Sequence, residues 1–322
     1  MTELSVSVAM CAYGSARFVR AQLDSLAQQT HQPDELVVCD DASSDTTYDI
    51  IAAFARSAPF EVRLFREYSN IGRVANFEKA ISHCTKDILF LSDADDVWHE
   101  RKIQRMLQAF QSAPTVAGVF CDAEVVDAAL RPLGYFHSEL RKFTPAIQTR
   151  LRNGEAYDAL LRGQIVQGAA LAFKASYRPL LLPLSRCWGH DSWIAILLGA
   201  VGTLVFVDEK LMSHRQHGGN LIGAIQAKPK RLERWAKKLC EPRQHYRRAL
   251  ATVTYFSKQM DDLHRRLACW PESACSQKFR EAIGRRRMKL QRRKRAVELI
   301  LGVLDNFHLQ HDPTTEELPP PR

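Results

Sequence analysis

Apolar runs and helix-forming segments alternate through the first third of the chain. Helices are predicted at 16–29, 47–56, 73–84 and 99–111, where apolar positions are interspersed with polar ones. Strands alternating with helices of this length predict βαβ units, and therefore an α/β fold with a mostly parallel central sheet flanked by helices. The apolar runs typical of buried strands are Val6–Cys11, Leu36–Cys39, Val62–Phe65, Ile88–Leu91 and Val116–Cys121.

The middle of the chain is less regular. Residues 123–150 lack a clear period and are interpreted as an insertion or an acceptor-binding loop. Helices are predicted at Asn153–Arg162 and Asp191–Leu198, and a strand at Thr203–Val207. Ile165–Phe173 is apolar with a glycine inside it.

The composition changes after about residue 228. Residues 228–300 contain 22 Lys and Arg but 7 Asp and Glu, a net charge of +15, whereas the whole chain carries +9. This region is predicted to be a basic α-helical extension, and the Pro- and Glu-containing end to be disordered. The predicted domains are 1–226, divided into a nucleotide-binding half 1–122 and an acceptor-binding half 123–226, then the extension 227–311 and the tail 312–322.

The overall composition bounds the class of protein. Hydrophobic residues make up 46% and charged residues 25%, so the chain can bury a core. None of the eight Cys shows C-x-x-C spacing, so no zinc site is indicated. The N-terminus lacks signal-peptide features, and no apolar stretch approaches the roughly 18 residues of a membrane span. We therefore expect a cytoplasmic protein, with peripheral contact at the inner face of the cytoplasmic membrane left open.

Polar residues follow three of the predicted strands. Tyr13 follows the first, Asp40 and Asp41 end the second, and the acidic segment Asp93–Asp96 follows the fourth. In parallel α/β sheets, ligands bind outside the carboxyl ends of the strands. These side chains are therefore predicted to share one pocket.

The acidic segment suits a divalent cation. Mg²⁺ and Mn²⁺ prefer oxygen ligands, and Mg²⁺ is often held by one or two carboxylates plus substrate phosphates. Alternation along an extended segment places Asp93 and Asp95 on the same side. A solvated acidic turn, or Asp96 capping the next helix, is the competing interpretation of this motif taken alone.

Residues 5–121 resemble the family-two glycosyltransferases, which have a GT-A fold. The resemblance is carried by Val6–Tyr13, Gln28–Thr30, Glu35–Asp45, Asn70–Gly72 with Asn76 and Phe77, and Leu91–Trp98. The form Asp93-Ala94-Asp95-Asp96-Val97-Trp98 is most similar to the rhamnosyltransferase-like subgroup, which builds surface polysaccharides. Gly14 stands where the family pattern usually has Asn.

The resemblance implies roles in binding the nucleotide. Tyr13 would stack on the base, and Asp41 would accept hydrogen bonds from it. Asp40 would support the loop or the ribose, and Arg73 would reach the nucleotide. The purely structural alternatives are that Tyr13 is a half-buried aromatic residue, that Asp40 and Asp41 are capping carboxylates, and that Arg73 is a surface arginine.

It also implies a metal and phosphate site. Asp93 would contact the ribose or the metal, and Asp95 the metal and the diphosphate. His214–His217 resembles the family segment Tyr-Arg-x-His, with His214 in place of the Tyr. His217 would then ligate the metal and Arg215 would neutralise phosphate charge; a surface histidine pair is the alternative.

The catalytic base is predicted in the second half. His190–Trp193 resembles the family motif in which the Asp is the general base, so Asp191 would take the proton of the acceptor hydroxyl. A plain helix N-cap is the alternative. Gly168–Ala170 resembles the small-residue segment beside the acceptor, with ordinary tight packing as its alternative.

These features together predict an inverting transferase that moves a sugar from a nucleoside-diphosphate donor to a glycan hydroxyl, using Mg²⁺ or Mn²⁺. The resemblance points to bacterial-type O-antigen or capsule synthesis, with a glycan or lipid-linked glycan as acceptor. A nucleotidyltransferase is one rival, but the Gly-rich phosphate loop it would need is missing after the first strand. A binding protein with an inactive transferase-like domain is the other.

The basic region 228–300 lies outside the resemblance. It could form charged helices that pack on the catalytic domain, attach to an anionic membrane surface, or bind nucleic acid. A lipid-linked acceptor would favour the membrane, and nucleic acid is the weakest of the three expectations.

Overall fold

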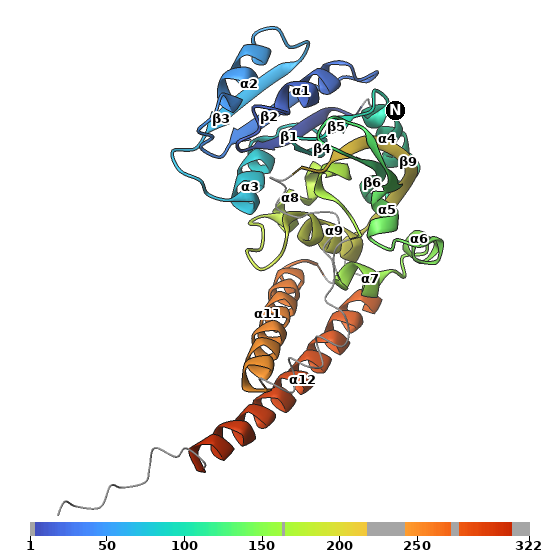
Figure 1. Cartoon of the computed structure of the whole chain (residues 1–322). Coiled ribbons are helices and arrows are strands. Elements are labelled where there is room, and N and C mark those ends of the chain that lie inside the picture. Colours follow the sequence, from blue (N-terminus) through green and yellow to red (C-terminus); the bar gives the residue numbers. More distant parts are fainter. Residues whose placement is uncertain (1–3, 163–164, 218–241, 272–276, 311–322) are drawn as a thin grey trace, which may run out of the picture. The chain divides into compact units, whose positions relative to one another are not determined.

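The computed structural model describes residues 4–162, 165–217, 242–271 and 277–310. These divide by their contacts into two units, residues 1–225 with 266–280, and residues 226–265 with 281–322. The first unit contains the sheet and the helices around it (Figure 1). The predicted boundary at 226/227 and the predicted disordered tail 312–322 both lie outside the described residues.

The first half of the sheet is parallel, as the alternation of strands and helices predicts. β3 pairs with β2, β2 with β1, and β1 with β4, all in parallel register. Their interior residues are almost all buried in the central strands, which explains why these segments are continuous apolar runs. The bounds are β1 Val6–Ala12, β2 Glu35–Asp40, β3 Glu61–Arg66 and β4 Ile88–Asp93.

The second half of the sheet is mixed. β8 (Leu171–Lys174) lies between β4 and β6 (Val116–Val126) and is antiparallel to both. β9 (Thr203–Arg215) is parallel to β6, and the two-residue β5 (Val97–Trp98) is antiparallel to β9. The complete order is β3-β2-β1-β4-β8-β6-β9-β5, with β7 (Pro132–Phe136) on β6. The parallel arrangement therefore holds for β1 to β4, which lie in the first part of the chain.

Helices cover the sheet. α4 has the most clearly amphipathic sequence, and it buries Ile103, Met106, Leu107 and Phe110. The predicted helix 153–162 is shorter than expected, because Asn153 and Gly154 end one helix before α7 begins. The bounds are α1 Val19–Ala27, α2 Thr47–Ala55, α3 Arg73–His83, α4 Lys102–Phe110, α5 His137–Leu140, α6 Pro145–Arg152, α7 Tyr157–Arg162, α8 Arg178–Leu181 and α9 His190–Val201, with 3₁₀ turns η1 Gly168–Ala170 and η2 Ala175–Tyr177.

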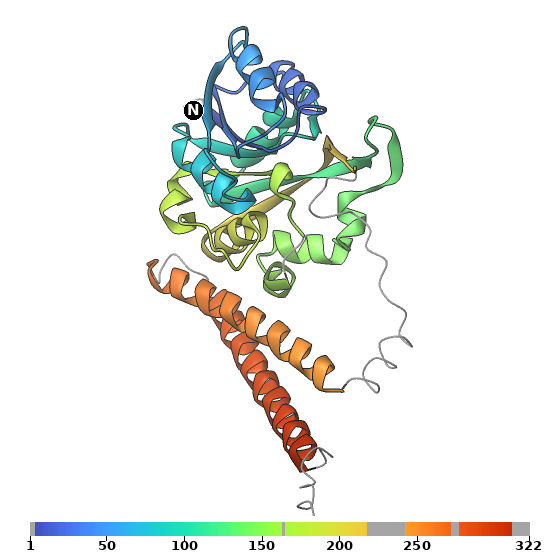
Figure 2. The same ribbon diagram turned by 60° about the vertical axis from the view of Figure 1, so that its left-hand side comes forward.

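The predicted helical extension is present as two long helices, α11 (Pro242–Ala268) and α12 (Gln277–Gln310). Figure 2 shows these two helices as the orange and red ribbons. Within the second unit, an ion pair of 2.7 Å joins Arg287 of α12 to Asp261 of α11. None of the described helices combines the length and apolarity needed to cross a membrane.

Candidate nucleotide and metal site

Three strand ends meet at one edge of the sheet. Cys11 of β1 is in register with Asp93 of β4, and Ala12 is in register with Asp40 of β2. Because the strands are parallel, the residues that follow them emerge on the same side. The structure thus brings Tyr13, whose side chain is 59% exposed, beside the two acidic segments.

The two aspartates after β2 shape the loops of this edge. Asp40 is fully buried and accepts hydrogen bonds from the amide and hydroxyl of Ser43. Asp41 accepts the amides of Ile71 (2.7 Å) and Gly72 (3.0 Å). Gly72 has φ +83°, a conformation that favours glycine, and it caps α3. Asp40 therefore supports its own loop, while Asp41 fixes the start of the helix that carries Arg73.

Arg73 stands between the acidic segment and α9. Its positive charge lowers the pKa of Asp93 against the stronger effects of burial and neighbouring carboxylates. The same charge lowers the pKa of His190, a smaller effect than that of burial. An arginine at the first position of α3 is thus within electrostatic range of both halves of the predicted site.

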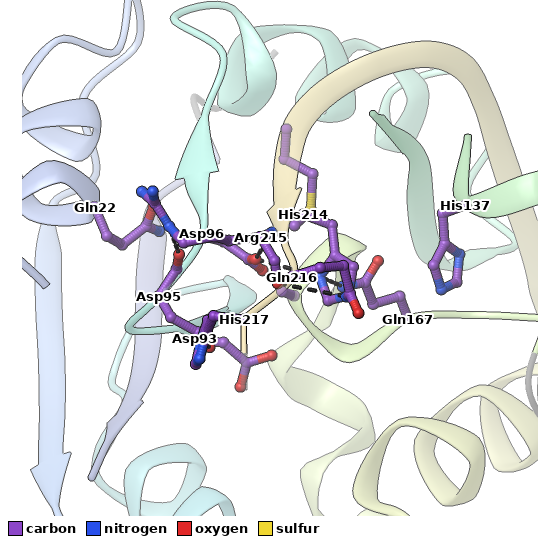
Figure 3. Close-up of polar contacts among 12 residues, drawn as sticks. Gln22, Asp93, Asp95, Asp96, His137, Gln167, His214, Arg215, Gln216 and His217 are labelled. Atoms are coloured by element: carbon purple, nitrogen blue, oxygen red, sulfur yellow. Dashed lines mark hydrogen bonds and ion pairs between the residues drawn. The ribbon is translucent and has the colours of Figure 1, made fainter. Parts of the chain in front are cut away.

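Asp95 and His217 meet although 122 residues separate them. His217 Nε2 lies 2.9 Å from Asp95 Oδ2 (Figure 3), and its ring packs against Phe18 at a centroid distance of 4.6 Å. The convergence of the acidic loop with the end of β9, which the resemblance implies, is present in the fold. The part each residue plays in catalysis stays a prediction.

The side chain of Arg215 already contacts other parts of the protein. Its side chain is nearly buried, and it donates to the backbone carbonyls of Asp95 and Ala128, each at 2.7 Å. Its own amide donates to Asp96 Oδ1 at 3.1 Å. Arg215 therefore ties the acidic loop to β9, and its predicted role in neutralising phosphate charge stays a prediction.

The carboxylates repel one another in a buried setting. Burial, and then the charges of Asp95 and Asp96, raise the pKa of Asp93 to about 7. Burial and the charge of Asp96 also raise the pKa of Asp95, although His217 opposes this. Burial lowers the pKa of His214, but the charge and the hydrogen bond of Asp96 raise it by more, so the net shift is upward. A cation would relieve this repulsion.

The donor set suits such a cation. Two carboxylates and an imidazole match the oxygen and nitrogen preferences of Mn²⁺, and Mg²⁺ needs only one or two of the carboxylates. Across the described residues, no three His, Cys, Asp or Glu side chains are arranged to hold a metal by themselves. The protein would therefore supply Asp95, with Asp93 or His217, and leave the other positions to water and a diphosphate.

Asp191 lies in the first turn of α9. Its Oδ1 accepts the amide of Ser192 at 2.7 Å, so it also serves the free N–H groups of the helix start. The charge of Asp191 opposes the lowering of the pKa of Arg141 that burial causes. The predicted base thus faces a cation from the irregular segment 137–143.

Two groups near the site were missed by the sequence predictions. Lys102 is fully buried; its Nζ donates to the carbonyl of Ala169 at 2.5 Å and lies 3.7 Å from the centre of the Trp98 ring. Gln167 bridges to His214 at 2.5 Å. A lysine in the first turn of an amphipathic helix gave no sign of burial. The sequence around Gln167 likewise gave no indication of its contact with His214.

Comparisons with known proteins agree with this geometry. The family model "Glycosyl transferase family 2" matches residues 7–162. An uncharacterized glycosyltransferase of Nostoc sp. is 25% identical over 222 residues, which is 67% of this chain and 66% of that protein. The Escherichia coli protein named UDP-Glc:alpha-D-GlcNAc-diphosphoundecaprenol beta-1,3-glucosyltransferase WfgD is 27% identical over 107 residues, 33% of this chain and 41% of that protein. The chain spans about two thirds or less of the length of these curated relatives.

A solved structure shows the same fold. The mannosyltransferase PcManGT from Pyrobaculum calidifontis, in complex with GDP-Man and Mn²⁺, superposes with a TM-score of 0.54 at 19% identity. The superposition covers 97% of this chain and 82% of that one. Asp93–Asp96 and the strands that position them lie inside the matched family model, whereas Asp191 and His217 lie beyond it. Residues 7–162 therefore belong to glycosyl transferase family 2.

Proposed function

We propose that the chain is an inverting, metal-dependent glycosyltransferase that uses a nucleoside-diphosphate sugar. The observation that carries this proposal is the 2.9 Å contact between Asp95 and His217 beside Asp93, at the sheet edge where Tyr13 and Asp41 emerge. In this proposal the nucleotide would lie beside the ends of β1 and β2, and its diphosphate would lie against the acidic loop with the cation. Bound there, Mg²⁺ or Mn²⁺ supplies positive charge against the leaving diphosphate.

Asp191 is proposed as the general base. An acceptor hydroxyl would attack the anomeric carbon as the bond to the diphosphate oxygen breaks, and its proton would pass to Asp191. The nucleoside diphosphate leaves, and the anomeric configuration inverts. The charge of Arg73 acts on His190, which precedes Asp191, and the charge of Asp191 opposes the lowering of the pKa of Arg141 by burial. Both arginines therefore hold positive charge near the reacting groups.

The acceptor class is proposed from the relatives. The E. coli relative is named for transfer of glucose from UDP-Glc to a GlcNAc-diphosphoundecaprenol, a lipid-linked sugar. We propose that this chain likewise extends a lipid-linked glycan of a bacterial-type surface polysaccharide, O-antigen or capsule. Such an acceptor would place the reaction at the inner face of the cytoplasmic membrane.

The test is a screen of UDP-, GDP- and dTDP-sugars with Mn²⁺, measuring the released nucleoside diphosphate with and without sugar acceptors. Asp95→Ala should abolish turnover, and Asp191→Asn should lower kcat by about a hundredfold or more, as expected for loss of a general base. The matched control is Asp208→Asn, an exposed carboxylate on β9 away from the cleft. Full activity of both site variants would refute the assigned roles, and no turnover or nucleotide-dependent stabilisation of the wild type would favour an inactive binding protein.

A further inference from the structure

The second unit carries an exposed surface of mixed chemistry that glycosyl transfer does not use. α12 buries one side, where Ile283, Val297 and Leu301 are at most 8% exposed. At about 100° per residue these three positions share one face. The opposite face is formed by Arg285, Met288, Arg292, Arg295, Leu299 and Val303, called here the α12 outer face.

The apolar members of the α12 outer face are open to solvent. Met288 is 54% exposed, Leu299 72% and Val303 62%. Single exposed apolar residues are ordinary, but these three share one helix face with three arginines. Arginines can extend their charged ends to a polar layer while their aliphatic stems lie along an apolar one. The α12 outer face therefore fits a boundary between apolar and anionic layers.

The charge of the same stretch is one-sided. From Arg285 to Val303 the helix has eight Lys and Arg, and its single acid is Glu298. Glu298 lies 3.8 Å from Lys294, so it is already engaged beside this face. Arg285 reaches back to Glu281 at 3.5 Å, which leaves Arg292 and Arg295 as the central cations of the face.

We propose that the α12 outer face docks on an anionic lipid surface, with Leu299, Val303 and Met288 entering the boundary between headgroups and acyl chains. A second copy of the chain is disfavoured, because two such faces would bring their arginines together. A nucleic acid would use the arginines but would leave three aliphatic side chains without an apolar environment. Anionic lipid is the partner that uses both.

The experiment is flotation of the full-length protein with vesicles of phosphatidylcholine alone, or with a third of the lipid replaced by phosphatidylglycerol. Wild type should bind the anionic vesicles and should not bind the neutral ones. The double variant Arg292→Glu with Arg295→Glu should bind about tenfold more weakly or worse, since each basic residue near such a surface contributes a few-fold. Leu299→Gln should also weaken binding to the anionic vesicles, because it removes an apolar side chain from the boundary between headgroups and acyl chains.

The control makes the same charge change elsewhere. Arg56→Glu with Arg152→Glu alters two exposed arginines of the first unit, and this variant should bind like wild type. Equal loss in the control, or wild-type binding by the Arg292 and Arg295 variant, overturns the proposal. So does an oligomer that Leu299→Gln dissociates, or binding of an oligonucleotide that Leu299→Gln leaves unchanged. Vesicle binding requires no turnover, so this outcome is independent of the proposed transferase activity.

Discussion

Gly168→Ala should disturb the helix that carries the predicted base. A Cβ on Gly168 would lie 2.5 Å from His190 Nε2, closer than carbon and nitrogen atoms approach without a bond. His190 cannot easily retreat, because its ring stacks on Phe77 with centroids 4.0 Å apart and an angle of 17°. Phe77 is itself fully buried in α3. The added methyl group must therefore move α3, η1 or the start of α9.

The magnitude follows from the packing. Overfilling a well-packed core typically costs about 1–3 kcal/mol of unfolding free energy. His190 precedes Asp191 directly, so a displacement of the ring shifts the predicted base, and a misplacement of about 1 Å can cost about a hundredfold in rate. We expect Gly168→Ala to lower kcat by about tenfold to a hundredfold, with little change in the KM of the nucleotide sugar, because Tyr13 and Asp41 are untouched.

Urea unfolding and steady-state kinetics test this prediction together. If the clash with His190 is the cause, Gly168→Ala should cost much less stability in a His190→Ala background than in the wild type. Gly284→Ala is the matched control, since a Cβ there meets nothing within 4 Å. A Gly168→Ala enzyme with unchanged kcat and stability would refute the reasoning, and an equal penalty in the His190→Ala background would show that another contact is responsible.

Two further predictions concern buried basic side chains. Burial, only partly offset by Asp191, lowers the pKa of His190 to about 4, so the unfolded chain binds its proton first. The stability that the neutral His190 contributes is complete above about pH 6.5 and is lost as the pH falls towards 4, by about 3 kcal/mol in all. His190→Phe should therefore flatten the pH dependence of the free energy of unfolding measured in urea. An unchanged pH dependence would show that His190 is not its cause. Lys102→Met should cost about 1–3 kcal/mol because the buried carbonyl of Ala169 loses its donor. An unchanged urea midpoint would show that another group satisfies that carbonyl.

The parallel half of the fold could be predicted because its signal is local. β1, β2 and β4 are buried on both faces, so each is a continuous apolar run followed by polar residues at its end. β9 could be predicted only as far as Val207. Its later residues pair with the polar end of β6, where register shifts between Cys121 and Glu124 break any simple alternation. The two residues of β5 are too few to form a pattern.

The same limit applies to the candidate site. Asp93 and Asp95 are indicated by their place after an apolar strand, and His217 by resemblance, so their proximity could be anticipated. The contact of Lys102 with Ala169 joins residues 67 positions apart, and that of Gly168 with His190 joins two different elements. Such contacts depend on how the helices and strands pack against one another, so neither residue type nor local spacing predicts them.

The acidic loop depends on the second half of the chain for its charge balance. Asp93, Asp95 and Asp96 lie at and after the end of β4, and besides Arg73 the groups that oppose their repulsion lie at and just after the end of β9. Asp96 accepts from the His214 ring at 3.2 Å and from the Arg215 amide at 3.1 Å, and Asp95 contacts His217.

Burial and the neighbouring carboxylates raise the pKa of Asp93, and the charge of His214 opposes that rise. The matched family segment thus supplies the three carboxylates together with Arg73, while the residues beyond it supply His214, Arg215 and His217. A cation bound at Asp95 would carry part of the balance now carried by His217. The proposed donor site therefore depends on β9 and the residues after it as much as on the first half of the chain, which contains the acidic motif.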